Sequence, residues 1–220
     1  MNKLPKQLRI VLPLIGLALM FLINPIHASA AQGTIDVNFN EFTFQTDDYN
    51  NLDVATNYYS EGDNEVVELI NSETGERLEV IKLEQQSTTS RSGATAHTLT
   101  RRFSIGEAAT VSLTVNVELY TSDSFRQINS IQGSYLAITN SVSSMRMEGS
   151  NINHWSSDGF PTTSIKYAAN GTLVSEVDTS VHGDVSGKLL GSGFSAGASQ
   201  GSTTYYRHNF NRSGTISIDR

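Results

Sequence analysis

The chain has 220 residues, with 22 acidic and 15 basic side chains and no cysteine. The absence of cysteine excludes disulfides, thiolate metal sites and thiol nucleophiles. The acidic excess, without a basic stripe, argues against a nucleic-acid partner, because such binding relies on cations that neutralise phosphates. The few local cations, at Arg101-Arg102 and at Arg207-His208 with Arg212, are expected to lie exposed at strand ends.

Residues 1–30 have the pattern of a bacterial export signal. Three basic residues and no acidic ones occupy the first nine positions, and the apolar run IVLPLIGLALMFLINPI follows. Ala28 and Ala30 then form the A-x-A arrangement that signal peptidase recognises. The run is shorter than the roughly 20 apolar residues of a membrane span, and Pro13 interrupts it. We predict a signal-peptide helix over residues 1–30, with cleavage after Ala30.

Residues 31–220 are then predicted to form one secreted, extracellular, β-rich domain. Without residues 1–30, the chain has 12 basic and 22 acidic residues, which gives a net charge of about −10. Exported chains often use disulfides, so this cysteine-free chain has to depend on its hydrophobic core or on a metal. That usage suits a bacterial protein released into the medium or the wall space.

Alternation with a period of two dominates this domain, which is the signal of half-buried strands. Ile35, Val37 and Phe39 share one face, and the phase then shifts as it would at a bulge. The segment 64–84 is predicted as a hairpin that turns near Gly75.

The clearest strand covers residues 109–120, where branched apolar residues alternate with polar ones. Further along the chain, residues 170–171 (Asn-Gly) and 213–214 (Ser-Gly) fit two-residue hairpin turns. Only residues 123–135 could hold a short helix. The apolar positions of the clearest strand are Val111, Leu113, Val115, Val117 and Leu119.

These segments predict an all-β protein, an antiparallel β-sandwich of jelly-roll or immunoglobulin-like type with about 9–11 strands. Serine, asparagine, aspartate and glycine residues fill the turns between the strands. A seam within the domain is placed near residues 156–163, where Gly159 and Pro161 interrupt the pattern.

The segment GSGFSAGASQG, residues 191–201, contains the G-x-S-x-G pattern of serine hydrolases twice. That pattern needs a helix directly after the serine, but residues typical of strands follow it here. A dinucleotide-binding loop fails for the same reason, because no helix N-terminus is expected to hold the phosphates. We predict a glycine-lined strand or loop over residues 187–198 and assign no catalytic residues.

Two loops are rich in carboxylates, which are ligands that calcium accepts. The first holds Asp47, Asp48 and Asp53, and the second holds Asp63 and Glu65. Neither loop matches the EF-hand pattern. Two interpretations therefore remain, a calcium site and ordinary acidic turns exposed to solvent. No cofactor other than calcium is expected. The histidines of the domain show no paired zinc spacing, so no metal site is assigned and each is expected to be solvated.

The only tryptophan stands among polar residues in the segment NHWSSDGFP. An aromatic ring can stack on the apolar face of a sugar while polar neighbours bind its hydroxyl groups. The alternative is that this ring plugs the end of the core. The predicted ligand-binding residues are His154, Trp155, Asp158, Phe160, Tyr205 and Tyr206.

Three segments of the second half, ELYTSDSFRQINSIQGSYL, GFPTTSIKY and SGTISI, resemble small secreted β-rich proteins of Gram-positive bacteria that have no assigned function. The shared layout is a signal peptide, a cysteine-free β-rich body and a Gly/Ser run before TTYYR. The resemblance implies no catalytic residues.

The sequence therefore favours a secreted, non-enzymatic module that binds a cell-envelope glycan or an extracellular protein. The main alternative is a membrane-active toxin or bacteriocin-like protein, because TVSLTVNVEL and KLLGSGFSAGAS also fit the alternation of membrane-spanning strands. Only in that case is a membrane a partner. A secreted hydrolase is the third hypothesis, since two carboxylates can meet in any fold.

Overall fold

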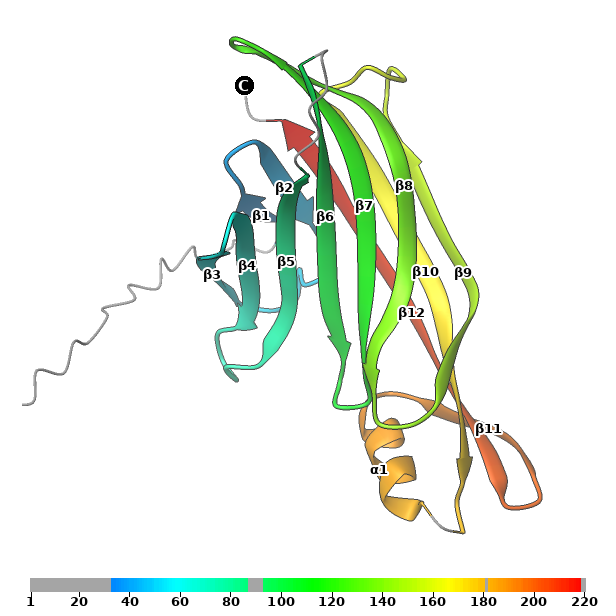
Figure 1. The fold of residues 1–220 in the computed structure, drawn as a ribbon. Helices are drawn as coiled ribbons and strands as arrows, with labels where there is room; N and C mark the ends of the chain where they lie inside the picture. The colour runs from blue at the N-terminus through cyan, green and yellow to red at the C-terminus, as the bar shows by residue number, and fades with distance from the viewer. Residues whose placement is uncertain (1–32, 87–92, 181, 219–220) are drawn as a thin grey trace, which may run out of the picture.

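The computed structural model describes residues 33–86, 93–180 and 182–218. These residues form twelve β-strands and one helix, and the strands build two antiparallel sheets that pack as a sandwich (Figure 1). The predicted all-β sandwich is confirmed, with one strand more than the upper end of the predicted range. The predicted signal-peptide helix lies outside the described residues.

The first sheet, called sheet I here, has the strand order β1-β2-β12-β10-β9, and β11 also pairs with β12. The last strand of the chain thus lies in the middle of the sheet, between β2 and β10. The strands are β1 (Ile35–Asn38), β2 (Phe42–Thr46), β9 (Met145–Trp155), β10 (Ser164–Asp178), β11 (Ser195–Gln200) and β12 (Thr203–Ile218).

The second sheet, sheet II, is a meander of β3 to β8 in which each strand pairs with the next one along the chain. This order differs from the Greek-key connections of jelly rolls and immunoglobulin domains. The strands are β3 (Val54–Glu61), β4 (Asn64–Asn71), β5 (Arg77–Gln86), β6 (Ala94–Ile105), β7 (Ala109–Ser122) and β8 (Phe125–Ser141).

The hydrophobic core lies between the two sheets and draws on both. The strand β7 has the predicted alternation, because all five of its branched apolar residues are at most 2% exposed. Sheet I contributes large aromatic side chains, among them Phe42, Phe44 and Tyr167, and sheet II contributes Phe103. A core of this extent replaces the disulfides that the chain lacks.

The long strands β6 to β10 and β12 give the molecule an elongated body (Figure 1). The β7–β8 turn and the loop 156–163 lie at one end, and helix α1 (Gly183–Gly191) and β11 lie at the other. The loop joins the paired strands β9 and β10. Its Thr162 also bridges to Ile128 of β8, which links the two sheets at this end.

Helix α1 replaces part of the strand or loop predicted over residues 187–198, so that prediction is wrong for its first half. Asp184 in the first turn and Lys188 in the last turn both suit the helix dipole. Leu189 is fully buried and anchors the helix. No helix within residues 33–86, 93–180 and 182–218 is long and apolar enough to cross a membrane.

Two predicted turns are also wrong, and the segment in which a short helix was considered forms a strand instead. Residues 170–171 lie within β10, residues 213–214 lie within β12, and most of residues 123–135 belong to β8. Both glycines have packing roles instead. A Cβ on Gly171 would lie 3.0 Å from the Phe210 ring, and one on Gly214 would lie 2.6 Å from the Phe44 ring.

Candidate functional site

One row of side chains crosses the outer face of sheet I from edge to edge. Trp155 on β9 lies opposite Lys166 on β10, which lies opposite Thr215 on β12. Thr215 lies opposite Gln45 on β2, and Gln45 lies opposite Asp36 on β1. Directly opposed residues point to the same face of a sheet, and Lys166 is exposed while both of its neighbours on β10 are buried. At about 4.8 Å per strand, the row spans roughly 19 Å of solvent-facing surface.

A groove of about 220 Å³ follows this row. Trp155 forms its wall at the β9 edge and is 48% exposed, so much of the indole surface is open to a ligand. Lys166, Thr215, Gln45 and Asp47 contribute an ammonium, a hydroxyl, an amide and a carboxylate to the lining. The groove thus combines one open aromatic ring with both donors and acceptors of hydrogen bonds.

The structure brings four of the six predicted site residues to one end of sheet I. His154 and Trp155 end β9, and Asp158 and Phe160 follow in the loop to β10. All four are exposed. Only Trp155 lines the groove; His154 precedes it in the strand and therefore points to the opposite face.

The other two predicted residues lie elsewhere on sheet I. Tyr205 and Tyr206 on β12 pair with Glu176 and Ser175 of β10. Glu176 comes ten residues after Lys166, the partner of Trp155, which places the tyrosines roughly 33 Å away along the strand. Tyr206 is 4% exposed and belongs to the core. The structure therefore does not join these tyrosines to Trp155 in one site.

The sequence interpretation missed the polar side of the groove. Period-two alternation alone places Lys166 and Thr215 on outward faces of their strands. It does not show that β10, β12 and β2 are neighbours, because Gln45 and Thr215 are far apart in the chain. The row exists only through the register of the assembled sheet.

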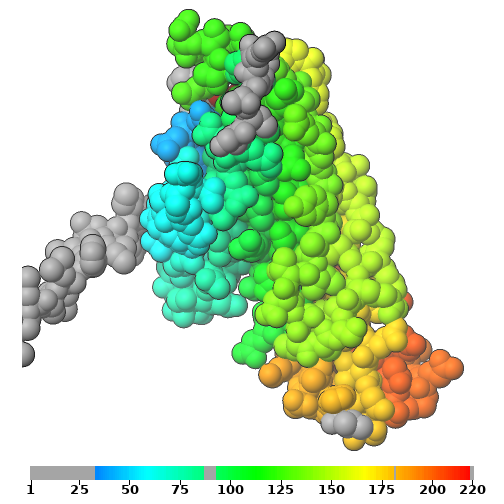
Figure 2. Space-filling view, viewed as in Figure 1, coloured from blue at the N-terminus to red at the C-terminus, as the bar shows by residue number. Residues whose placement is uncertain are grey.

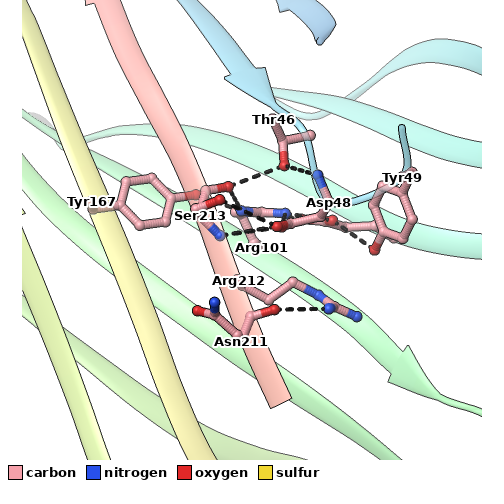
Figure 3. Close-up of polar contacts among 9 residues, drawn as sticks. Thr46, Asp48, Tyr49, Arg101, Tyr167, Asn211, Arg212 and Ser213 are labelled. Atoms are coloured by element: carbon pink, nitrogen blue, oxygen red, sulfur yellow. Dashed lines mark hydrogen bonds and ion pairs between the residues drawn. The ribbon is translucent and has the colours of Figure 1, made fainter. Parts of the chain in front are cut away.

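A buried ion cluster (Figure 3) contacts Tyr167 and Ser213, which are two residues of the groove lining. Arg101 of β6 is 1% exposed and binds both carboxylate oxygens of Glu79 on β5, through Nε and through Nη2 at 2.8 Å. Its Nη2 also donates to Asp48 Oδ2 at 2.9 Å. The prediction that Arg101 lies exposed is wrong, because it shares the inward face of β6 with Leu99 and Phe103.

This cluster holds the floor of the groove in place. Arg101 Nη1 donates to the Ser213 carbonyl at 2.9 Å and to Tyr167 Oη at 2.7 Å. Asp48 accepts the Ser213 N–H at 3.1 Å, and Thr46 Oγ1 donates to the Ser213 carbonyl at 3.0 Å. Both sheets thus fix the segment of β12 that leads into Thr215 (Figure 3). A floor held in this way is preorganised for a ligand.

The electrostatics of the cluster favour a charged arginine and neutral phenols. Burial opposes the charge on Arg101, but the adjacent Glu79 carboxylate holds its pKa well above the ordinary arginine value. Burial, and then the Glu79 charge, raise the pKa of Tyr49, whose hydroxyl donates to Glu79 at 2.9 Å. Burial likewise raises the pKa of Tyr167.

Arg212 lies beside this cluster and does not form part of an exposed basic patch. Its guanidinium lies over the Phe103 ring, 4.5 Å from the centroid, and 5.6 Å from that of Tyr49. Such contacts stabilise a cation whose hydration is reduced. The prediction of an exposed strand end is wrong here as well.

A second cavity, of about 340 Å³, opens between the β1–β2 connection and the β3–β4 hairpin. At its base, His97 is 2% exposed, with Nε2 2.6 Å from Glu41 Oε2. Asp63 and Glu65 line the same cavity, and Glu65 accepts the Asn40 N–H at 3.0 Å. The prediction of a solvated His97 is wrong, because this residue shares the inward face of β6 with Arg101.

The acidic loops do not gather into a metal site within the part of the chain that the structure describes. No three histidine, aspartate or glutamate side chains come together there in an arrangement that could hold an ion. Asp48, from the first acidic loop, is 8% exposed at its side chain and is paired with Arg101. Its oxygens are thereby committed to the cluster between the sheets.

The glycine-rich segment has a different order of elements from a nucleophile elbow. Helix α1 precedes Ser195, and the exposed strand β11 contains it. His208 on β12 packs against Phe194 and places Nδ1 3.1 Å from the Gly193 carbonyl oxygen. These contacts fix the start of β11 against β12.

No protein-family model, curated protein or solved structure matches this chain.

Proposed function

We propose that this protein is a secreted, non-enzymatic module that binds a glycan of the bacterial cell envelope in the groove beside Trp155. The observation that carries the proposal is the row from Trp155 through Lys166 and Thr215 to Gln45 on one face of sheet I. Export with loss of residues 1–30 would bring this face to the cell envelope.

The chemistry of the row suits a pyranose chain. A sugar ring has an apolar face of C–H groups, which packs on an indole, and a rim of hydroxyls that both donate and accept hydrogen bonds. Trp155 offers the ring surface and Lys166 donates. Thr215 donates and accepts, and Gln45, whose Nε2 also donates to Asp36 Oδ1 at 3.0 Å, keeps one N–H and its carbonyl oxygen for a ligand. Past Gln45 the row continues to the exposed Asp36, so a second sugar of a chain would have a hydrogen-bond acceptor there.

The charge of the protein selects among glycans. Residues 31–220 carry a net charge of about −10, which repels polyanions. The groove lining contains one cation, Lys166, and one carboxylate, Asp47, and their charges are opposite in sign. An uncharged glycan, such as a wall oligosaccharide without phosphate, is the ligand class that fits best.

Co-sedimentation of the chain from Ala31 with purified bacterial cell walls tests the proposal. The wild type is expected in the pellet, and Trp155→Ala in the supernatant. Tyr135→Ala is the matched control, because Tyr135 is an exposed aromatic residue on sheet II, 55% exposed. A wild type that stays in the supernatant, or a Trp155→Ala variant that pellets as well as wild type, contradicts the proposal.

A second candidate function, attachment to a lipid surface, is favoured by the exposed aromatics near the Ile128–Thr162 bridge. Phe125 is 55% exposed and Phe160 is 44% exposed, and phenylalanine is among the residues that surface-bound proteins bury at the lipid boundary. Vesicles of zwitterionic lipid distinguish the two functions. Lipid attachment would be lost in Phe125→Ser with Phe160→Ser, whereas glycan binding would be kept.

A further inference from the structure

Strand β3 exposes apolar side chains at one edge of sheet II. Eight large apolar side chains are exposed among the described residues, and three of them lie in or just before this strand. Tyr58 is 46% exposed, Tyr59 is 38% exposed, and Leu52 before the strand is 41% exposed. In Figure 2 the β3–β4 hairpin forms the outer margin of the molecule on that side. Tyr58 and Tyr59 are consecutive and point to opposite faces of the sheet, so exposed aromatic surface flanks the free edge of β3 on both faces, as expected for an edge that associates.

β3 also lacks the features that protect other edge strands. Bulges, prolines, lysines and short length normally prevent an edge from pairing with another chain. β1 has only four residues, β9 shifts register once against β10, and β8 shifts three times against β7. β3 has eight residues in unbroken register with β4 and contains no proline or lysine. It is the long, regular edge within the described residues.

We propose that β3 pairs with β3 of a second copy of this chain, antiparallel about a two-fold axis at Tyr58. An axis perpendicular to the sheet keeps the inner and outer faces continuous, so each residue pairs with one that points the same way. Tyr58 then lies beside its own copy, and Asn57 lies opposite Tyr59. The two copies of sheet II become one continuous sheet.

The charges of the strand favour this register. With the axis at Tyr58, the only acidic residue of the strand, Glu61, lies opposite Ala55, and no two carboxylates within the paired strands face each other. With the axis moved to Asn57, Glu61 would lie opposite Asp53. Like charges that face each other across strands are destabilising. Facing carboxylates therefore disfavour the register centred on Asn57, whereas the register centred on Tyr58 has none and sets two exposed tyrosine rings side by side.

The interface would be small, and this sets the expected affinity. The interface would consist of one added strand pair and two tyrosines from each copy, so its buried area would be at the low end of the range for specific interfaces. We expect a dissociation constant on the order of 10 μM, which corresponds to a reversible dimer. The Trp155 groove lies on sheet I, so dimerisation does not depend on glycan binding.

Sedimentation velocity over a range of concentrations up to about 200 μM tests the dimer. Residues 33–218 hold both sheets and the described core, so the chain from Ala31 is the form to use. The wild type is expected to shift from monomer to dimer across this range. Tyr58→Lys places two cations side by side at the axis and is expected to remain monomeric. Tyr135→Lys, on β8, is the control and is expected to dimerise as the wild type does.

Tyr58 also accepts a hydrogen bond from the Asn38 N–H at 3.3 Å, so Tyr58→Lys has to keep the wild-type circular dichroism spectrum. A second variant avoids this dependence. The chain has no cysteine, so Tyr58→Cys introduces a single thiol beside its own copy, within reach of a disulfide. Mild oxidation is expected to yield covalent dimer faster for Tyr58→Cys than for Tyr135→Cys.

A wild type that is monomeric at every concentration, together with equal crosslinking at positions 58 and 135, would overturn the proposal. The edge would then be available to an extended peptide of another protein. If the substitutions at Tyr58 change neither sedimentation nor crosslinking while the protein still binds cell walls, the dimer alone is rejected. If the protein dimerises but does not bind cell walls, the glycan site alone is rejected.

Discussion

Glu79 and Arg101, on the neighbouring strands β5 and β6, form a two-pronged ion pair that is buried between the sheets, each residue being 1% exposed. Removal of two charges from water is costly, and such a pair is maintained only when further hydrogen bonds satisfy it. Here Tyr49 donates to Glu79, while Asp48, Tyr167 and the Ser213 carbonyl accept from Arg101. Loss of one partner therefore leaves several buried groups without compensation.

Arg101→Met is expected to lower the free energy of unfolding by about 3–5 kcal/mol, because it leaves Glu79 and Asp48 buried without their cation. Urea denaturation of both proteins measures the difference. Arg102→Met is the matched control, since Arg102 is exposed on the other face of β6, and its change is expected within about 0.5 kcal/mol. Equal effects of the two substitutions would show that the cluster does not hold the sheets together.

Stability is expected to decrease in alkali because of Tyr49 and Tyr167. Burial raises the pKa of both phenols in the folded protein above the ordinary value of 10.0. Above that pH the unfolded chain loses these protons while the folded chain keeps them, so the unfolded state gains relative stability. The contribution is complete below pH 10 and is lost as the pH rises further.

Urea denaturation across this alkaline range measures the decrease, and ultraviolet absorbance of phenolate follows the titration. Two of the eight tyrosines are expected to titrate only as the protein unfolds. Tyr167→Phe should make the alkaline decrease shallower, although it also lowers stability at neutral pH. If all tyrosines ionise freely in the folded protein, the burial argument is wrong.

The sequence predicted the sandwich because alternation is a local property. In β7, the strand from Val111 to Leu119 can be predicted without knowledge of its neighbours, and its inward face is buried as expected. The same alternation places His97 and Arg101 in phase with Leu99 and Phe103. The inward position of both charged groups was therefore present in the sequence, and the general expectation that charges are exposed concealed it.

The errors concern residues whose role depends on partners far away in the chain. Gly171 and Gly214 resemble turn glycines, yet they leave space for the Phe210 and Phe44 rings in the middle of long strands. Helix α1 contains three glycines in nine residues, which weakens any helical pattern. Trp155 was found as an isolated aromatic residue, whereas its groove partner Gln45 comes from a strand more than 100 residues earlier.

Gly214→Ala is expected to destabilise the protein by about 1–3 kcal/mol through overpacking. The added Cβ would lie 2.6 Å from the Phe44 ring and 2.9 Å from Tyr167 Oη. Gly187→Ala is the opposing control, because nothing lies within 4 Å of its Cβ and it sits in helix α1. It should stabilise the protein by about 0.5–1 kcal/mol. Thermal unfolding of the two variants should therefore shift in opposite directions, and a shift of the same sign would contradict the packing argument.

The polar side of the groove can be tested with the only tryptophan of the chain as reporter. Sugar stacking on Trp155 should alter its fluorescence, so titration with soluble wall oligosaccharides gives an affinity directly. Lys166→Ala and Thr215→Val each remove one hydrogen-bonding group and should weaken binding about five- to tenfold without loss of stability. Lys188→Ala, on the exposed side of α1, removes the same charge outside the groove and should leave the affinity unchanged. Equal losses for Lys166→Ala and Lys188→Ala would indicate that net charge controls binding, and would remove the row across sheet I from the explanation.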